Sequence, residues 1–344
     1  MRLRGGSMTR RLVQALVALA LLPAAALAVP RTPEPRVHPR DAAPVPTYVR
    51  KIESAIVGLK VRARANATSS ARLGVHRFAS GVVFDPRGYA VTVSYVLMDA
   101  VEIEAFRRDG RTVSARLTGF DVDSGLGVVK LDGEGWTAAA VGQSGDIAVG
   151  TLTGTVGVDE DNDLIHITGA VQSVRRFSAS WEYMLERAFI VSPASPQWGG
   201  SALVNDRGEV VAIGSLRLGE PPYTNMFIPL ERFLPVKDEI IASGRVQSRT
   251  PRPWLGLYTS ADRDGITVNG FSPIGPAAQA GFQRGDRIVG VNGVDVKSQE
   301  EFYEALWKNR AGEVIKVSVQ RDNRVVVIPV QSMDRHRALT GPRP

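Results

Sequence analysis

The sequence contains no cysteine and only four histidines among its 344 residues. The absence of cysteine excludes disulfides, thiol nucleophiles and cysteine-based metal sites. Dense runs of lysine or arginine are also lacking, so a nucleic-acid partner is not expected. The glycine pair Gly125 and Gly127 lacks the context of a phosphate-binding loop, and we expect no cofactor.

The first 28 residues have the pattern of a secretory signal peptide. They carry four arginines and no acid, followed by an apolar run over Leu12–Leu22 that is too short for a confident membrane span. Small residues predict cleavage after Ala28, and an uncleaved N-terminal anchor is the alternative. Removal of residues 1–28 lowers the formal net charge from +7 to +3. The pattern therefore predicts a periplasmic or secreted protein.

The residue pattern of the remaining chain changes several times, and these changes mark the predicted domain boundaries. Many short apolar runs, separated by glycine, aspartate and asparagine, predict a mainly β fold built from barrels or sandwiches. Later, Ser298 and Glu301 form a capping box at the start of an amphipathic helix. The predicted boundaries are a signal peptide over 1–28, a proline-rich tether over 29–46, a β domain over 47–244, a linker over 245–252, a second compact domain over 253–332 and a flexible tail over 333–344.

The second domain resembles a PDZ domain. The likeness is carried by "WLGL" at 254–257, by "GPAAQAGFQRGDRIVGVNGVDV" at 275–296 and by the helix at 298–310. The resemblance implies a groove between a strand edge and a helix, to which an extended peptide adds as a strand. The alternative is a vestigial groove whose residues all belong to the core. The expected peptide-binding residues are Trp254, Leu255, Gly256 and Leu257, with Tyr303 and Leu306 on the helix.

Three stretches of the first domain resemble the HtrA (DegP/DegS-like) family of serine proteases. They are "ASGVVFDPRGYAVTVSYVL", "DGRTVSARLTGFDVDSGLGVVKL" and "SPQWGGSALVNDRGEVVAIGS". With the PDZ-like domain, the resemblance covers roughly residues 48–332. It implies a trypsin-like double β-barrel followed by one PDZ domain.

The resemblance also shows what is missing. The family's catalytic His, Asp and Ser fall on Tyr95, Gly125 and Gly199, and two residues of its oxyanion loop fall on Gln197 and Trp198. A serine attacks only when a base takes its proton and a third group orients that base. Tyrosine, with an ordinary pKa near 10, is a poor base at neutral pH. We therefore predict an inactive serine protease homologue.

The predicted function is binding, as a scaffold, adaptor or regulator acting through the PDZ groove. The expected partners are C-termini or extended, unfolded segments of envelope proteins, or an active HtrA-type protease, and the resemblance also allows a homotrimer. One alternative is an active serine endopeptidase with a rebuilt site, for which Ser201 is the obvious nucleophile. Another is a metal-dependent role for the acidic run 159–163 beside His166, although its spacing differs from a calcium loop and no metal site is predicted.

Overall fold

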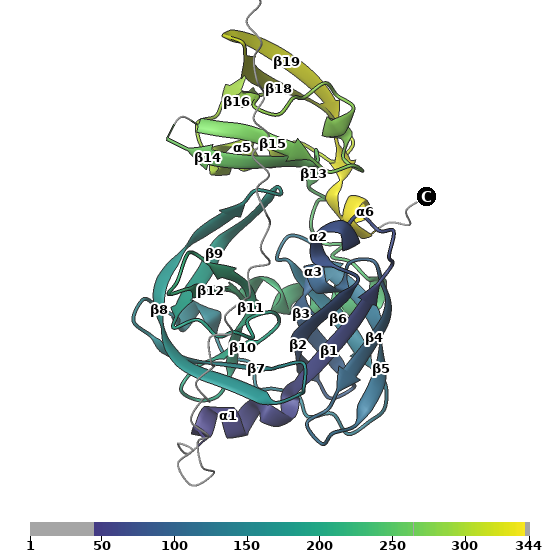
Figure 1. Cartoon of the computed structure of the whole chain (residues 1–344), viewed down its shortest axis with the longest axis vertical. Coiled ribbons are helices and arrows are strands. Elements are labelled where there is room, and N and C mark those ends of the chain that lie inside the picture. Colours follow the sequence, from purple (N-terminus) through teal and green to yellow (C-terminus); the bar gives the residue numbers. More distant parts are fainter. Residues whose placement is uncertain (1–44, 264, 341–344) are drawn as a thin grey trace, which may run out of the picture. The chain divides into compact units, whose positions relative to one another are not determined.

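The first barrel combines strands that are buried almost throughout with strands whose residues alternate between core and solvent. In one of them, Ile103 and Ala105 are buried while Glu102 and Glu104 face outward. The computed structural model describes residues 45–263 and 265–340. Six antiparallel strands close in the order β1-β2-β3-β6-β5-β4, which leaves no free sheet edge (Figure 1). The strands are β1 (Ile56–Ala63), β2 (His76–Asp85), β3 (Tyr89–Val93), β4 (Ala100–Phe106), β5 (Thr112–Asp121) and β6 (Leu126–Leu131).

A second six-stranded barrel closes in the order β10-β11-β12-β9-β8-β7. Two of its strands are unusually long, and their hairpin extends beyond the barrel toward the C-terminal domain (Figure 1). The turn of that hairpin spans residues 180–182. The strands are β7 (Leu152–Val158), β8 (Leu164–Ala179), β9 (Tyr183–Ser192), β10 (Ala202–Val204), β11 (Val210–Leu218) and β12 (Thr224–Pro229).

Short helices cover the ends of the barrels. The longest, α4, is followed by Gly244, whose left-handed conformation forms the C-cap. Its N–H donates to the carbonyl of Ile240. The helices are α1 (Thr47–Ile52), η1 (Glu53–Ala55), α2 (Ser70–Leu73), α3 (Ser94–Leu97), η2 (Ser144–Asp146), η3 (Leu230–Arg232), η4 (Leu234–Val236) and α4 (Lys237–Ser243).

The C-terminal domain is a five-stranded antiparallel sheet, β14-β15-β16-β18-β19, packed against α5, with β17 paired to β16. Ser298 caps α5, its Oγ accepting a hydrogen bond from the N–H of Glu301. Strand β14 is an edge strand of this sheet. The elements are β13 (Pro253–Trp254), β14 (Leu257–Asp262), β15 (Gly265–Phe271), η5 (Pro276–Ala278), β16 (Arg287–Val291), β17 (Val294–Asp295), α5 (Gln299–Trp307), β18 (Val314–Arg321), β19 (Arg324–Gln331), β20 (Met333–Asp334) and α6 (Arg335–Thr340).

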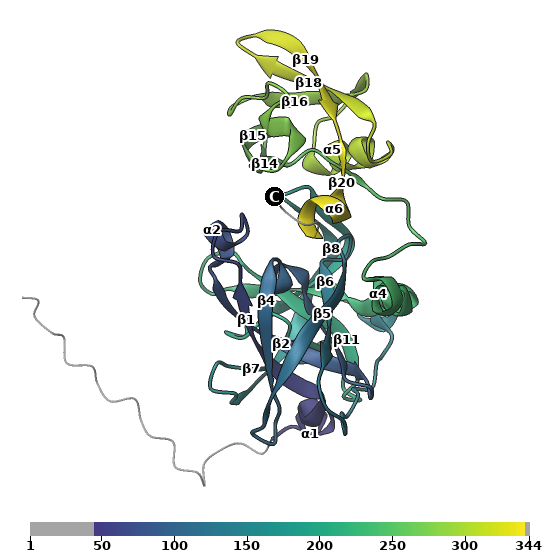
Figure 2. The ribbon, with the colours of Figure 1, turned by 90° about the vertical axis from the view of Figure 1, so that its right-hand side faces the viewer.

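The last residues differ from the sequence prediction of a tail from residue 333. Met333 pairs with Trp254 across the small β13–β20 sheet, and residues 335–340 form α6 (Figure 2). Buried side chains hold this segment, because Arg335 and Ala338 are 3% and 5% exposed. The periodicity of the tail is too short to predict such a helix, which is stabilised by contacts with distant residues.

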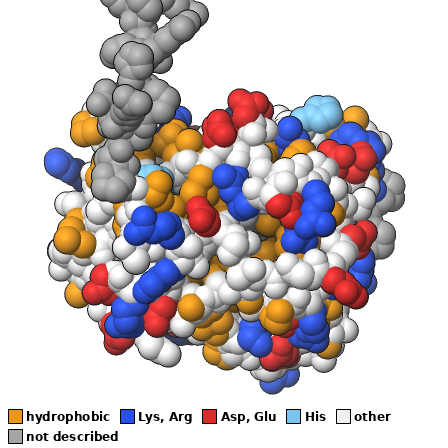
Figure 3. All heavy atoms as spheres, turned by 90° about the horizontal axis from the view of Figure 1, so that it is seen from below, with side chains coloured by type: hydrophobic (Ala, Val, Ile, Leu, Met, Phe, Trp, Pro, Cys, Tyr) orange, Lys and Arg blue, Asp and Glu red, His pale blue; other side chains and the backbone are white. Residues whose placement is uncertain are grey.

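The mainly β class and the two-part architecture are confirmed. The predicted signal peptide and most of the tether lie outside the described residues. Within residues 45–263 and 265–340, no helix is long and apolar enough to cross a membrane. On the face shown in Figure 3, Lys and Arg side chains are interspersed with Asp and Glu rather than gathered in one patch.

Candidate functional site

A cavity of about 320 Å³ opens on the barrels between β2, α3 and the loop before β10. It brings together four of the positions that the sequence analysis singles out, Tyr95, Gln197, Trp198 and Gly199. A Cβ atom placed on Gly199 would lie 3.6 Å from the Tyr95 hydroxyl oxygen. The lining residues are Leu73, His76, Arg77, Phe78, Ala79, Tyr95, Val96, Glu160, Pro196, Gln197, Trp198 and Gly199.

This cavity is poor in groups that form covalent intermediates. Its lining contains no serine, threonine or cysteine, and Tyr95 supplies its one hydroxyl. The Tyr95 hydroxyl donates to the carbonyl of Ser215 at 2.8 Å. Burial raises the pKa of Tyr95 to about 12, against a smaller lowering by Trp198. Tyr95 is therefore neutral at physiological pH, and its hydroxyl proton is directed at the Ser215 carbonyl.

The loop before β10 is held in place by aromatic and hydrogen-bond contacts. The Arg217 guanidinium lies 4.8 Å from the centre of the Trp198 ring and 4.4 Å from that of Tyr223, within the range of cation–π attraction. Ser201 is fully buried and its hydroxyl donates to the Trp198 carbonyl at 2.9 Å. Ser201 does not line the cavity, so the proposed substitute nucleophile faces the loop backbone instead.

Gly125 does not line the cavity but lies next to the start of α3, where its carbonyl accepts a hydrogen bond from the N–H of Ser94. Its φ of +79° is a conformation that side chains with a Cβ rarely adopt. A Cβ here would lie 2.9 Å from the Tyr183 hydroxyl oxygen. That hydroxyl is buried and donates to the carbonyl of Ser124 at 2.6 Å. The place where a third catalytic side chain would begin is therefore closed by Tyr183.

Within the part of the chain that the structure describes, neither His76 nor His166 has a hydrogen bond to a serine or threonine hydroxyl. His76 lies on the rim of the cavity and is exposed, while His166 lies within β8 opposite Val156. In the acidic run, the Asp159 carboxylate accepts hydrogen bonds from the N–H groups of Asp161 and Asp163 and so stabilises its own turn. Among the described residues, no three His, Asp or Glu side chains gather as metal ligands.

In the PDZ-like domain, backbone N–H groups of the 254–257 loop bind a carboxylate of this chain. The N–H of Leu255 donates to Glu182 Oε2 at 3.0 Å, and that of Leu257 to Oε1 at 2.7 Å. Gly256 has a φ of +81°, which allows the tight loop to present these N–H groups. Glu182, at the tip of the β8–β9 hairpin, is fully buried.

The helix α5 faces the same hairpin. The Tyr303 hydroxyl donates to the carbonyl of Ala179 at 2.6 Å and accepts from the N–H of Glu182 at 3.1 Å. Tyr303 and Leu306 are both fully buried. Trp254, in β13, is 5% exposed. Of the predicted groove residues, Leu255, Leu257 and Tyr303 thus bind the hairpin tip through hydrogen bonds.

Sequence reasoning missed Glu182 and the buried Arg335. Desolvation raises the pKa of Glu182 to about 7, while backbone N–H groups of the 254–257 loop and the charge of Arg335 lower it in part. Arg335, on α6, has two guanidinium nitrogens without a hydrogen-bond partner among the described residues. Neither residue lies in a motif, and only the folded chain brings them together.

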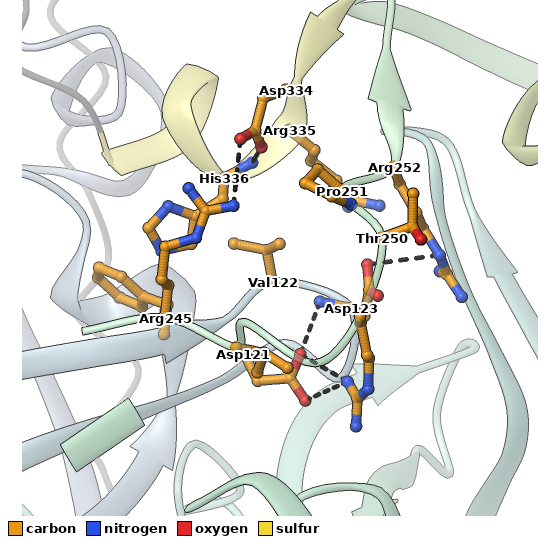
Figure 4. Close-up of a pocket in the computed structure, with 13 residues that line it drawn as sticks. Asp121, Val122, Asp123, Arg245, Thr250, Pro251, Arg252, Asp334, Arg335 and His336 are labelled. Carbon is orange, nitrogen blue, oxygen red and sulfur yellow. Dashed lines mark hydrogen bonds and ion pairs between the residues drawn. The ribbon is translucent and has the colours of Figure 1, made fainter. Parts of the chain in front are cut away.

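A small polar pocket of about 30 Å³ lies where the predicted linker meets the first barrel (Figure 4). The Arg249 guanidinium contacts the buried Asp121 carboxylate at 2.9 Å. Arg252 pairs with Asp123 at 3.4 Å, and Arg245 with Asp334 at 3.2 Å. The first two pairs attach residues 249–252 to the end of β5 and the β5–β6 turn, which leads directly to Gly125, and the third attaches residue 245 to β20.

The fold is a trypsin-like double barrel joined to a PDZ-like domain, and the comparisons agree. Residues 79–213 match the model of the trypsin-like peptidase domain, and residues 253–331 match that of the PDZ domain. The chain is 31% identical over 306 residues to the serine endoprotease DegS of Escherichia coli K12, covering 82% of this chain and 83% of the relative. It belongs to the HtrA family of serine protease homologues, which confirms the resemblance.

Two solved structures share the fold. A serine endoprotease from Yersinia pestis is 25% identical, with a TM-score of 0.54 over 85% of this chain and 99% of that one. The HtrA-type protease AlgW, solved with a decapeptide, is 22% identical, with a TM-score of 0.55 over 86% of this chain and 98% of that one.

Proposed function

We propose that this HtrA homologue is a catalytically inactive, exported protein that binds other proteins through its PDZ groove. The observation that carries the proposal is the lining of the barrel cavity, which holds no serine, threonine or cysteine. Tyr95, Gly125 and Gly199 stand at the positions that the family resemblance gives to base, orienting acid and nucleophile. Loss of these groups removes about four to six orders of magnitude of rate.

The ligand class follows from the groove. Backbone N–H groups of Leu255 and Leu257 converge on a carboxylate, and the edge of β14 offers strand pairing to an extended segment. A protein C-terminus satisfies both requirements. The partners we propose are the C-termini or extended segments of envelope proteins, and an active HtrA-type protease is a further candidate. AlgW solved with a decapeptide is consistent with peptide binding in this family. Export rests on the predicted signal peptide, and a homotrimer rests on the family resemblance alone.

The test is hydrolysis of an unfolded substrate. The chain lacking residues 1–28 is incubated with fluorescently labelled casein, beside an active HtrA protease and a heat-denatured control. We expect no turnover above the denatured control. Turnover that survives Ser201→Ala would point to another nucleophile, and turnover abolished by Ser201→Ala would establish the rebuilt endopeptidase; either would overturn the proposal.

A further inference from the structure

The edge of β14 that no other strand of its sheet covers is paired with the tip of the β8–β9 hairpin. The N–H of Thr259 donates to the carbonyl of Ser180, in the turn between β8 and β9, at 2.9 Å. This is the backbone contact by which an extended peptide adds to a sheet edge. The hairpin tip, residues 179–182, therefore lies along β14 as a short added strand would.

The carboxylate site of the same groove is also filled. Glu182 Oε1 and Oε2 each accept one N–H of the 254–257 loop, and the side chain is fully buried. The carbonyl that Thr259 binds lies two residues before Glu182, so one short segment supplies both the carboxylate and the paired backbone. A C-terminal peptide would present the same two groups to the same donors.

The helix side of the groove completes the contact. The Tyr303 hydroxyl bridges the Ala179 carbonyl and the Glu182 N–H. Met184, two residues beyond Glu182, is 5% exposed and belongs to the hydrophobic core of the PDZ domain. The strand edge, the carboxylate loop and the helix thus all hold the hairpin tip.

We infer that residues 179–182 are an internal ligand of the PDZ groove and that a partner's C-terminus has to displace Glu182 to bind. The inference rests on the proposed function, because it concerns the regulation of the same groove. The N–H groups of Leu255 and Leu257 cannot serve two carboxylates at once. The apparent affinity for a partner is therefore lowered by the fraction of molecules in which the groove is filled.

The experiment compares the chain lacking residues 1–28 with its Glu182→Ala and Glu182→Gln variants. Glu186→Gln is the matched control, since it makes the same chemical change on the same hairpin at an exposed position outside the groove. The probe is a pool of fluorescent decapeptides with randomised last three residues and a free C-terminal carboxylate. The same pool with amidated C-termini controls for carboxylate recognition. Hydrogen exchange over residues 255–259 reports the state of the groove without any ligand.

We expect Glu182→Ala to speed exchange over residues 255–259 and to tighten binding of the free-carboxylate pool on the order of tenfold. Glu182→Gln, which keeps one acceptor, should fall between, and Glu186→Gln should match the parent chain. Unchanged exchange in Glu182→Ala, with the variant folded by circular dichroism, would overturn the internal ligand. Faster exchange without binding of either pool would support the internal ligand but contradict the proposed peptide-binding function.

Discussion

The barrel cavity lacks a nucleophilic side chain, whereas the PDZ groove keeps its backbone donors but is occupied by another part of the chain. The cavity has about 320 Å³ of space, but its lining contains no serine, threonine or cysteine to act as a nucleophile. The groove keeps its chemistry, with N–H groups aimed at a carboxylate, but the chain's own Glu182 fills it. Side-chain chemistry disappears with single substitutions, whereas a backbone donor site persists as long as the loop keeps its shape. The comparison therefore points to the groove as the working site.

The two regions are physically connected. Glu182 fills the groove, and Tyr183, the next residue, closes the space beside Gly125. The Arg335 guanidinium lies 5.8 Å from the centre of the Tyr183 ring, and its charge also acts on Glu182. Release of the hairpin tip consequently disturbs contacts in the barrels as well as in the groove.

The largest expected effect concerns variants that restore catalytic residue types to the barrel cavity, so that it would no longer differ from that of an active protease. Tyr95→His, Gly125→Asp and Gly199→Ser together restore the residue types of a triad. We nevertheless expect casein hydrolysis to remain about 10⁴-fold or more below that of an active HtrA protease. The reason is that an aspartate at Gly125 meets the Tyr183 hydroxyl and an unfavourable φ. The rate is measured with the fluorescent casein assay.

Two controls interpret that triple variant. The double variant without Gly125→Asp shows what the other two positions supply alone. Adding Tyr183→Leu to the triple variant opens the space beside residue 125. Hydrolysis by the triple variant within tenfold of an active protease would show that the framework remains preorganised for catalysis, contrary to our expectation.

A smaller effect separates the two glycines of the degenerate site by stability. We expect Gly125→Ala to lower the free energy of unfolding by about 2–5 kcal/mol, from backbone strain and crowding against Tyr183. Gly199→Ala should change it by less than about 0.5 kcal/mol, because its Cβ has no neighbour closer than 3.6 Å. Urea unfolding followed by circular dichroism measures both. Equal decreases in the free energy of unfolding for the two variants would mean that position 125 accommodates a side chain as easily as position 199.

Much of the architecture could be predicted because strands, turns and helix caps leave patterns within short stretches of sequence. In "GVVFDPRGYAV", the turn sequence DPRG between two apolar segments predicts a hairpin, and the cap at Ser298 predicts the start of α5. The positions of Tyr95 and Gly199 follow from motif spacing, and the fold brings both into one cavity.

The filled groove could not be predicted in this way. Ser180 and Glu182 lie in a stretch that resembles an ordinary polar turn, while their partners Thr259 and Leu255 are more than 70 residues away in sequence. The helix α6 is missed for the same reason, since its stability depends on packing rather than on its own pattern. Local sequence patterns do not record which distant surface a turn will contact.

The next effect is the pH dependence of Glu182 docking in the PDZ groove. The pKa of Glu182 is raised to about 7, chiefly by burial, with Arg335 and Tyr303 the charged and titratable groups that face it from α6 and α5. A raised pKa means that its contribution to docking is complete below about pH 4.5 and is lost as the pH rises through 7, by up to about 3 kcal/mol.

We therefore expect the exchange protection factors of residues 255–259, corrected for intrinsic rates, to fall between pH 5 and pH 8. Glu182→Gln cannot titrate, so its protection factors should stay constant over the same range. Protection that instead rises with pH in the parent chain would mean that the ionised carboxylate is the preferred form in the groove. The Glu186→Gln control should follow the parent chain in either case.

The smallest effect tests whether surface charge contributes to holding the hairpin. Arg176 on β8 pairs with Glu304 of α5 at 2.6 Å and with Glu186 at 2.8 Å, and all three side chains are more than 40% exposed. Exposed ion pairs are screened by water and salt and add little to stability. Arg176→Ala should therefore change probe binding only slightly, and less at high salt. A change as large as that of Glu182→Ala would move the docking determinant from the buried carboxylate to the surface pairs.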